Sequence, residues 1–389
     1  MRILHLHDAP HIGGGASGYI KQLFESAASR GHLQWAFSLD QEADHPALQG
    51  ARAFRYAWPP SALRRRLDFH TWHRPLAEAL EAWIQEVQPD LIHVQNCVPF
   101  RNTVFPALGR AGRPVVMTVH DFSLVDPNPA GLDRRGLGGT VRAWLDRRSL
   151  ATSRREVFAA VDLFLCPTEA LRDTIGFRAG QARLQRLPIA LAEARPAPAG
   201  SPQQPLRIFF AGTLYRSKGV DVLLRALAAA GGAARSASLE IAGEGDRRSD
   251  LESLAAELGL RERVAFLGRC DAARMDAAYA ACHILVLPSR VPENSPLTVL
   301  EAGARGRPSL APATGGVPEL LADARGWTFP SEDVAALARA LESVAADPAE
   351  AVARGARMRA WVRAEFDPQR HWESVESAWR EVVRSEPRR

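Results

Sequence analysis

The 389-residue sequence predicts an α/β protein built from two doubly wound, Rossmann-like domains. The chain is longer than one ordinary hydrophobic core requires. Apolar stretches of strand length alternate with amphipathic helical stretches in both halves, as in parallel βαβ units. A stretch rich in proline, alanine and serine, without periodicity, separates the halves at residues 193–205 and predicts a linker. We therefore expect an N-terminal domain at residues 1–192 and a C-terminal domain at residues 206–365.

The first half starts with a strand pattern, MRILHLHD, and continues with a helical pattern that ends at Gly31. The glycine turn Gly13, Gly14 and Gly15 lies between the two. A second helical stretch, RPLAEALEAWIQEVQ, precedes three further strand patterns, which read DLIHVQN, PVVMTVHD and DLFLCPT. Strands and helices in this order predict a parallel sheet with helices on both faces.

The C-terminal segment, residues 366–386, has the pattern of a helix with one apolar face. Trp372, Val375, Trp379 and Val382 recur at helical spacing. A helix with such a face is stable only when another element covers that face, so we expect it to be buried against one of the domains.

Composition is that of a soluble globular protein, with 46% hydrophobic and 24% charged residues. No apolar run approaches the roughly 20 residues that span a bilayer, and the N-terminus does not have the pattern of a signal peptide. The four cysteines are scattered, which argues against a disulfide framework or a zinc site. We expect a cytoplasmic protein.

The positive charge is uneven along the chain. Residues 1–200 contain 24 basic and 19 acidic residues, a net charge of +5, whereas residues 201–389 contain 25 of each. Arginines interleave with apolar residues from Arg134 to Phe158. Such a segment suits the inner face of an anionic membrane, with peripheral attachment; a solvated arginine-rich helix packed on its own domain explains it equally well. No nucleic-acid-binding module accompanies the charge, so nucleic acid is not a predicted partner.

The most informative stretch is PENSPLTVLE, Pro292 to Glu301. It places Glu293 and Glu301 eight positions apart, after the apolar strand pattern HILVLPSR. Asn294 and Ser295 are suitable N-cap residues, and proline is favoured at the first helical position that follows. A helix that begins here would direct free N–H groups toward a phosphate at the carboxyl end of a buried strand.

A second motif upstream reads RIFFAGTLYRSKGVDVLLRAL. It is a strand, a glycine turn and a helix, with Lys218 in the turn. The chain has only two lysines, Lys21 and Lys218. A lysine beside a glycine turn supplies a point charge to a phosphate that the backbone can approach closely. Two further glycine turns occur in SLEIAGEGD and TGGVPEL.

Together these four motifs resemble the C-terminal half of a family 4 glycosyltransferase (glycosyl transferases group 1). The resemblance covers the second half closely and the first half loosely. It implies the GT-B fold, in which two Rossmann-like domains face a central cleft and a C-terminal helix crosses back onto the N-terminal domain. It also implies transfer of a hexose-type sugar, with retention of configuration, from a UDP- or GDP-linked donor to a saccharide or lipid-linked acceptor in polysaccharide biosynthesis. No cofactor and no metal ion are expected.

The resemblance further assigns roles to residues of the second half. Lys218 would neutralise the diphosphate of the donor. Many relatives have an arginine after the glycine of this turn, where the present chain has Thr213 after Gly212; Arg216 is the candidate to supply that charge. Glu301 would bind the ribose hydroxyls. Glu293 would hold the donor sugar near the reacting carbon, and its role as a covalent nucleophile in a double displacement stays open against same-face attack.

The backbone around these groups completes the implied donor site. The segment Asn294, Ser295, Pro296 and Leu297 would present backbone amides to sugar and phosphate, and Gly243 of the IAGEGD turn would lie near the nucleotide.

In the first half, the resemblance places His120 at the donor sugar and the loop with Gly14 and Gly15 beside the diphosphate. His120 and Asp121 end the strand PVVMTVHD at its carboxyl edge, where α/β sheets bind ligands. His93 and Asn96 end the neighbouring strand pattern, and ordinary strand-end polar groups are the favoured interpretation for both.

Two alternative functions compete with glycosyl transfer. A nicotinamide-dependent oxidoreductase would need G-x-G-x-x-G and an acid about 20 residues further on. Gly13, Gly15 and Gly18 have this spacing, but Asp40 is a poor candidate for the acid. A non-catalytic GT-B binding protein is the second alternative, and the presence of Glu293 and Lys218 argues against it.

Overall fold

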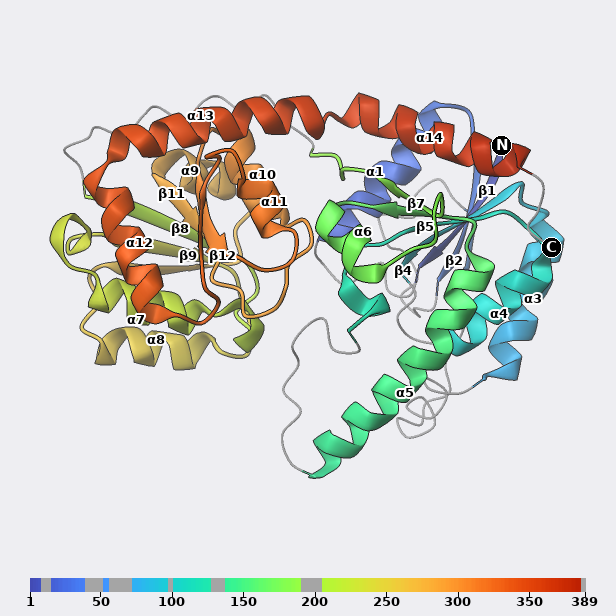
Figure 1. Cartoon of the computed structure of the whole chain (residues 1–389), viewed down its shortest axis with the longest axis horizontal. Helices are drawn as coiled ribbons and strands as arrows, with labels where there is room; N and C mark the ends of the chain where they lie inside the picture. The colour runs from blue at the N-terminus through green and yellow to red at the C-terminus, as the bar shows by residue number, and fades with distance from the viewer. Residues whose placement is uncertain are drawn as a thin grey trace. The chain divides into compact units, whose positions relative to one another are not determined.

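The computed structural model describes residues 1–7, 15–38, 52–55, 72–96, 101–126, 137–189 and 205–385. The described chain divides into two compact units (Figure 1). The first comprises the chain to Pro188 together with the C-terminal helix from Pro368 onward, and the second runs from Ile189 to Asp367. Apart from residue 205, the predicted linker at 193–205 lies outside the described residues.

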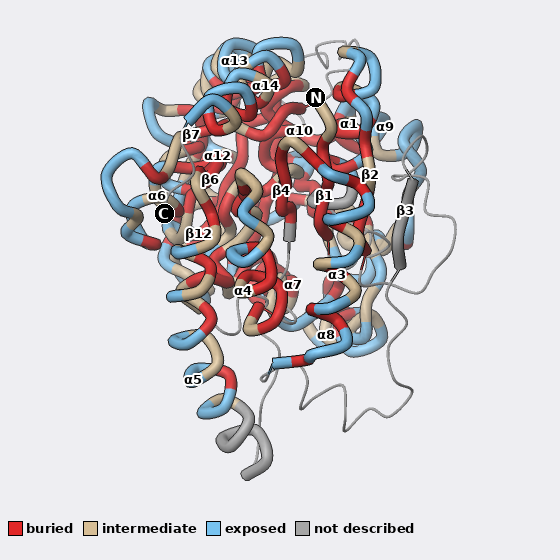
Figure 2. The backbone as a smooth tube through the Cα atoms, turned by 90° about the vertical axis from the view of Figure 1, so that its right-hand side faces the viewer, coloured by how far each residue is buried: buried red, intermediate tan, exposed pale blue. Residues whose placement is uncertain are grey.

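The first unit contains a seven-stranded sheet in the order β3-β2-β1-β4-β5-β6-β7, with every pair parallel. Its strands are β1 (Arg2–His7), β2 (Leu33–Ser38), β3 (Arg52–Arg55), β4 (Leu91–Asn96), β5 (Val115–Thr118), β6 (Leu163–Cys166) and β7 (Ala182–Leu184). The central strands are buried, whereas the outer turns of the helices are exposed (Figure 2). Burial on both faces explains the nearly continuous apolar runs in their sequences.

Helices of the first unit are α1 (Gly15–Ser29), α3 (Arg74–Val87), α4 (Arg101–Ala111), η2 (Phe122–Leu124), α5 (Leu137–Ala160), α6 (Glu169–Ile175) and α14 (Pro368–Arg384). The apolar face predicted for the C-terminal segment is buried in α14. It forms one hydrophobic cluster with Ile3, Tyr19 and Leu91 of the first unit. The C-terminal helix therefore completes the core of the first unit, although it follows the whole second unit in sequence.

The second unit contains a six-stranded sheet in the order β10-β9-β8-β11-β12-β13, again parallel throughout. Its strands are β8 (Arg207–Ala211), β9 (Ser238–Ala242), β10 (Val264–Gly268), β11 (Ile284–Val286), β12 (Ser309–Pro312) and β13 (Trp327–Phe329). Its helices are η3 (Arg216–Lys218), α7 (Val220–Ala229), η4 (Gly232–Ala234), α8 (Arg248–Glu257), α9 (Ala272–Ala281), α10 (Leu297–Ala304), α11 (Val317–Leu321), α12 (Val334–Ala346) and α13 (Pro348–Glu365).

Both sheets are doubly wound, which confirms the predicted fold class. In the first sheet the strand order reverses between β1 and β4, and in the second it reverses between β8 and β11. Loops that leave two such strands diverge to opposite faces and open a crevice at the carboxyl ends. Lys218 follows β8 and Glu293 follows β11, so both lie at the switch point of the second sheet.

Candidate functional site

Two glycine turns hold the loop after β11 in place. Gly219 has φ +66°, and a Cβ there would lie 2.0 Å from the carbonyl oxygen of Pro288. Gly315 has φ +61°, and a Cβ there would lie 2.2 Å from the carbonyl oxygen of Glu293, which accepts a 2.8 Å hydrogen bond from the amide of Gly316. Only glycine allows both approaches, so the turns after β8 and β12 fix the backbone around Glu293.

Lys218 and Glu293 form an ion pair at this point. Lys218 Nζ lies 2.6 Å from Glu293 Oε1, and Ser289 Oγ donates to the same oxygen at 2.6 Å. The two charged side chains are 27% and 18% exposed, so they are shielded but open to a ligand. The sequence pointed to both residues but not to their pairing. Ser289 was missed altogether; its only signal is its position at the end of an apolar strand pattern.

A second charged pair anchors the same loop. Arg290 donates to both carboxylate oxygens of Asp221 at 2.7 Å, and its amide donates to the carbonyl of Ser217 at 2.8 Å. Burial raises the pKa of Asp221, but the hydrogen bonds and charge of Arg290 outweigh it and leave that pKa below its ordinary value. This bidentate pair ties the β11 loop to the start of α7.

Glu301, on α10, is held by a tyrosine that the sequence did not indicate. The Tyr279 hydroxyl donates to Glu301 Oε2 at 2.7 Å. Burial raises the pKa of Glu301 above its ordinary value, against the effects of this hydrogen bond and of the Arg305 charge. Burial, together with the nearby Glu301 carboxylate, raises the pKa of Tyr279 well above its ordinary value. Among the described residues Glu301 Oε1 has no protein donor, so one carboxylate oxygen is available to a ligand.

The start of α10 differs from the prediction by one residue. The helix begins at Leu297, and Pro296 occupies the N-cap position without a side-chain cap. A residue before proline avoids the helical region, which keeps Ser295 outside the helix. Neither Asn294 nor Ser295 caps the helix: Asn294 is buried, and the buried Ser295 Oγ has no partner among the described residues. Pro296 has no N–H, so it cannot offer the backbone amide predicted for it.

The turn after β8 carries the remaining predicted donor-site residues of this region. Arg216 is exposed in η3, and its guanidinium has no acidic partner in the described part of the chain. Thr213, in the same turn, is also exposed. Gly243 has φ +144°, and a Cβ there would lie 1.8 Å from the Gly212 carbonyl oxygen. These two glycines bring the loops after β8 and β9 into contact.

In the first unit, His120 follows β5 at the carboxyl edge of the sheet. Its Nε2 lies 3.2 Å from Gln95 Oε1, which requires an Nε2–H donor, and its ring contacts Tyr19 edge-on at 5.3 Å. Burial lowers the pKa of His120 to about 4, so the imidazole is neutral at pH 7. Asp121 accepts from the Ser123 amide at 2.8 Å and so caps η2.

The other predicted positions of the first unit divide into core and undescribed residues. His93 is fully buried, and its Nε2 lies 3.0 Å from Thr118 Oγ1. This position fits a core residue better than one that contacts a ligand. Gly15 is the first residue of α1. Gly13 and Gly14 lie outside the described residues, as does the side chain of Asn96.

Histidines also gather around α14 in a way that the sequence did not suggest. The ring of Trp379 lies 5.5 Å from His93, 5.7 Å from His32 and 6.2 Å from His5. Burial lowers the pKa of His5 to about 3 and that of His371 to about 3. The core of the first unit is therefore built around neutral imidazoles.

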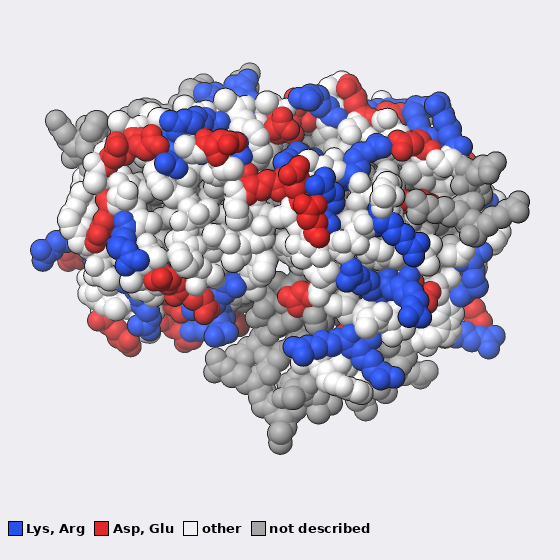
Figure 3. Space-filling model, in the orientation of Figure 1, with Lys and Arg blue, Asp and Glu red and all other residues white. Residues whose placement is uncertain are grey.

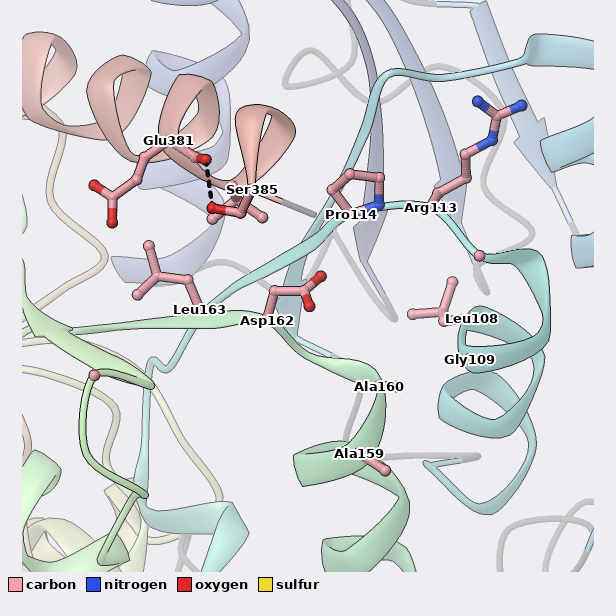
Figure 4. A pocket seen from close by; sticks show the side chains of 13 residues that line it. Leu108, Gly109, Arg113, Pro114, Ala159, Ala160, Asp162, Leu163, Glu381 and Ser385 are labelled. Carbon is pink, nitrogen blue, oxygen red and sulfur yellow. Dashed lines mark hydrogen bonds between the residues drawn. The ribbon is translucent and has the colours of Figure 1, made fainter. Parts of the chain in front are cut away.

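A cavity of about 180 Å³ lies at the opposite edge of the first sheet, where β5 and β6 begin (Figure 4). Its polar groups are engaged by the protein. Asp162 accepts from the amide of Val115 at 2.8 Å, Glu381 pairs with Arg183 at 2.6 Å, and Ser385 Oγ donates to the Glu381 carbonyl at 2.9 Å. This cavity is not a candidate for the reaction.

Within the described ranges, no three histidine, cysteine or carboxylate side chains gather in a way that could hold a metal ion. That the transfer needs no metal ion stays a prediction, because a metal ion could bind together with the substrate. Of the helices in the described part of the chain, none has the length and apolarity needed to cross a membrane.

Two family models match the chain and together cover most of it. The model described as Glycosyltransferase Family 4 matches residues 13–188, and the model described as Glycosyl transferases group 1 matches residues 192–361. The boundary between the two matches falls close to that between the two units.

Individual proteins agree with these matches. The 2-deoxystreptamine glucosyltransferase of Streptomyces kanamyceticus is 30% identical over 344 residues, 87% of this chain and 81% of that protein. A GDP-mannose-dependent monoacylated alpha-(1-6)-phosphatidylinositol monomannoside mannosyltransferase of Corynebacterium glutamicum is 34% identical over 181 residues, less than half of either protein. Anabaena Alr3699/HepE, solved with UDP and glucose, is similar in fold, with a TM-score of 0.75 at 19% identity over 98% of this chain and 100% of that one. The chain belongs to the glycosyl transferases group 1 family and has the GT-B fold.

Proposed function

We propose that the protein transfers a hexose-type sugar from a UDP- or GDP-linked donor to a saccharide acceptor, with retention of configuration and without a metal ion. The observation that carries this proposal is the Lys218–Glu293 pair at the switch point of the second sheet, 2.6 Å apart and open to a ligand. A cation and a carboxylate at such a crevice can meet the two halves of a nucleotide sugar, the diphosphate and the sugar hydroxyls.

The proposed role of Lys218 is to stabilise the charge of the leaving group. Expelling a nucleoside diphosphate builds negative charge on the departing oxygen, and a cation in place before the reaction stabilises that charge. Lys218 and the exposed Arg216 are the cations of the β8 loop that can supply it. The first amides of α10 add donors on the other side of the crevice.

The two glutamates have different surroundings, which supports different roles. Glu293 Oε1 already accepts hydrogen bonds from Lys218 and Ser289. An oxygen so engaged suits a group that orients a sugar hydroxyl better than it suits a covalent nucleophile, so we favour same-face attack. Glu301, held through one oxygen by Tyr279, keeps the other oxygen for the ribose.

The relatives support the proposed donor and acceptor classes. One relative uses GDP-mannose and a lipid-linked acceptor by its name, and one structural neighbour holds UDP. Together with the basic first half of the chain, these support a lipid-linked saccharide acceptor in cell-surface polysaccharide assembly, reached from the cytoplasmic side of an anionic membrane. His120, neutral at pH 7, would contact the donor sugar from the first unit.

Thermal unfolding with a panel of UDP-, GDP- and ADP-sugars against NAD and NADP tests the proposal. A ligand that binds only the native state raises the melting temperature by mass action. We expect stabilisation by UDP- or GDP-sugars and none by NAD or NADP. Stabilisation by a nicotinamide nucleotide alone would overturn the proposal, and binding without turnover of any acceptor would point to a non-catalytic protein.

A further inference from the structure

A groove of about 640 Å³ lies on the surface of the first unit between α4 and α5. The α4 wall presents Asn102 and Arg110, eight positions apart and therefore on one face of the helix. The α5 wall presents Leu145, Arg148 and Glu156. Trp72, which is 44% exposed, lies at the groove with the Arg110 guanidinium 4.6 Å from its ring centroid.

The groove runs toward the ligand-binding edge of its sheet. Since β4 and β5 are parallel neighbours, α4 must run back from the carboxyl end of β4 to the start of β5. Asn102, in the first turn of α4, therefore lies near the carboxyl edge, and Arg110 lies near the amino edge. A chain-like ligand in this groove would be directed along α4 toward the edge that carries His120.

The walls favour a ligand that combines hydroxyl groups, apolar C–H faces and negative charge. An exposed indole packs well on the apolar face of a pyranose ring, and carboxylate and guanidinium groups bind hydroxyls. Arg110 is paired with Glu81 at 2.6 Å, but Arg148 has no acidic partner among the described residues. Arg147 on the same helix is likewise without one, and basic side chains gather over α5 (Figure 3).

We propose that this groove binds an acidic saccharide chain, and that it is where a glycan acceptor is held away from the reacting end. The assignment to an acceptor rests on the function proposed above; the binding of a saccharide rests on the groove. A membrane surface fits less well, because the site is concave. The groove also has one exposed tryptophan rather than an apolar stripe.

Affinity electrophoresis of the full-length protein tests the proposal, with native gels cast with hyaluronan, with alginate or with uncharged dextran. We expect retardation by an acidic polysaccharide, and at least fivefold weaker retardation for Trp72→Ala. Trp144→Ala is the matched control, because Trp144 is 60% exposed on α5 but does not line the groove. It should stay within twofold of the wild type. Both side chains are exposed, so neither variant should unfold.

Three results would overturn the proposal. The first is the absence of retardation by both acidic polysaccharides, and the second is an equal loss of retardation in the two variants. The third is binding to phosphatidylglycerol vesicles, but not to phosphatidylcholine vesicles, in a co-sedimentation assay. If Trp144→Ala weakens this binding and Trp72→Ala does not, the surface is a membrane contact. Stabilisation by UDP or GDP is measured on the same preparations. If nucleotides still bind but no polysaccharide retards the protein, only the proposal that the groove binds a saccharide is refuted. If a polysaccharide retards the protein but no nucleotide binds, only the proposed transferase activity is refuted.

Discussion

The two sheets share a topology but differ in the chemistry at their switch points. In the second unit the crevice between β8 and β11 carries an accessible ion pair, Lys218 with Glu293, and a carboxylate with one free oxygen, Glu301. In the first unit, the corresponding edge carries the partly buried imidazole of His120, and the core beneath it carries the buried imidazole of His93. Desolvation lowers the pKa values of both below the ordinary range.

This difference suits the two sheet edges to different tasks, one to binding a charged donor and the other to hydrogen bonding with uncharged sugar hydroxyls. Ionised groups at a partly exposed crevice are ready to bind a charged donor, because a ligand can replace one partner of the pair by another charge. Neutral histidines can donate an N–H hydrogen bond, but they have no positive charge with which to neutralise a diphosphate. They suit hydrogen bonding to sugar hydroxyls and stable packing of α14. Five predictions test this contrast and the chemistry proposed for the donor crevice, from the largest expected effect to the smallest.

Replacing Lys218 should have the largest effect. Lys218→Ala removes the cation proposed to stabilise the leaving group, and we expect turnover to fall about 10²–10³-fold. Lys21→Ala is the matched control, since Lys21 is the other lysine of the chain and lies exposed on α1, 3.8 Å from Glu25. Steady-state kinetics of both variants measures the effect. Equal, small losses in the two variants would remove Lys218 from the mechanism.

The two glutamates should respond in opposite ways. Glu293→Ala releases Lys218 from its ion pair, so UDP or GDP should bind as well as before or more tightly, while turnover falls about 10²-fold. Glu301→Ala should weaken nucleotide binding about tenfold or more, because it removes a charged acceptor from the ribose. Calorimetric Kd values and kcat distinguish the variants. Weaker nucleotide binding in Glu293→Ala would contradict the idea that the Glu293 carboxylate and the diphosphate compete for Lys218.

Tyr279→Phe tests whether a buried hydroxyl positions Glu301. The substitution keeps the ring that packs edge-on against Phe209 at 5.0 Å and removes only the donor to Glu301 Oε2. We expect nucleotide binding to weaken about tenfold, with a further rise in the pKa of Glu301 that moves the pH dependence of binding upward. Unchanged binding and an unchanged pH profile would make the contact purely structural.

The histidines of the first unit should make its stability depend on pH. The native pKa values of His5, His120 and His371, about 3, 4 and 3, lie below the unfolded value of 6.5. The unfolded state therefore binds more protons, and the unfolding free energy should fall as the pH drops from about 6.5 toward 4.

Each such histidine adds a slope of up to about 1.4 kcal/mol per pH unit. Urea unfolding between pH 7.5 and 4.5 measures the slope. His371→Gln should reduce the slope by the contribution of one histidine, because one proton fewer is taken up on unfolding. His371 Nδ1 lies 2.6 Å from the Arg186 carbonyl, so the neutral ring donates there, and glutamine can replace that donor. A slope of the same size in the variant would show that His371 does not contribute.

The smallest expected effect is that of chelation. Transfer should proceed at the same rate, within about twofold, in EDTA and in Mg²⁺, because Lys218, Arg216 and the α10 amides are proposed to carry the charge that a metal would otherwise neutralise. Loss of activity in EDTA with recovery in Mg²⁺ or Mn²⁺ would show that the leaving group needs a divalent ion. It would leave the contrast between the two crevices intact but change how the donor crevice works.

The sequence by itself determined the fold class and indicated the location of the proposed donor crevice. Apolar runs that alternate with amphipathic helices leave few arrangements besides parallel sheets, and parallel strands bring their carboxyl ends to one edge. Glycines in the turns and the proline of PENSPL therefore indicated where a ligand binds. Lys218 could be named because it is one of only two lysines in the chain, and Glu293 and Glu301 because PENSPLTVLE resembles a motif of a known family.

Only the tertiary structure decided which groups meet. Lys218 and Glu293 are 75 positions apart and Tyr279 and Glu301 are 22 apart, so their hydrogen bonds depend on how neighbouring strands are ordered. No local pattern distinguishes a serine or tyrosine that holds a carboxylate from one that fills the core, and the same holds for the histidines packed around Trp379. Local sequence determines secondary structure through short-range propensity, whereas side-chain partners depend on long-range packing, and packing alone placed these groups together.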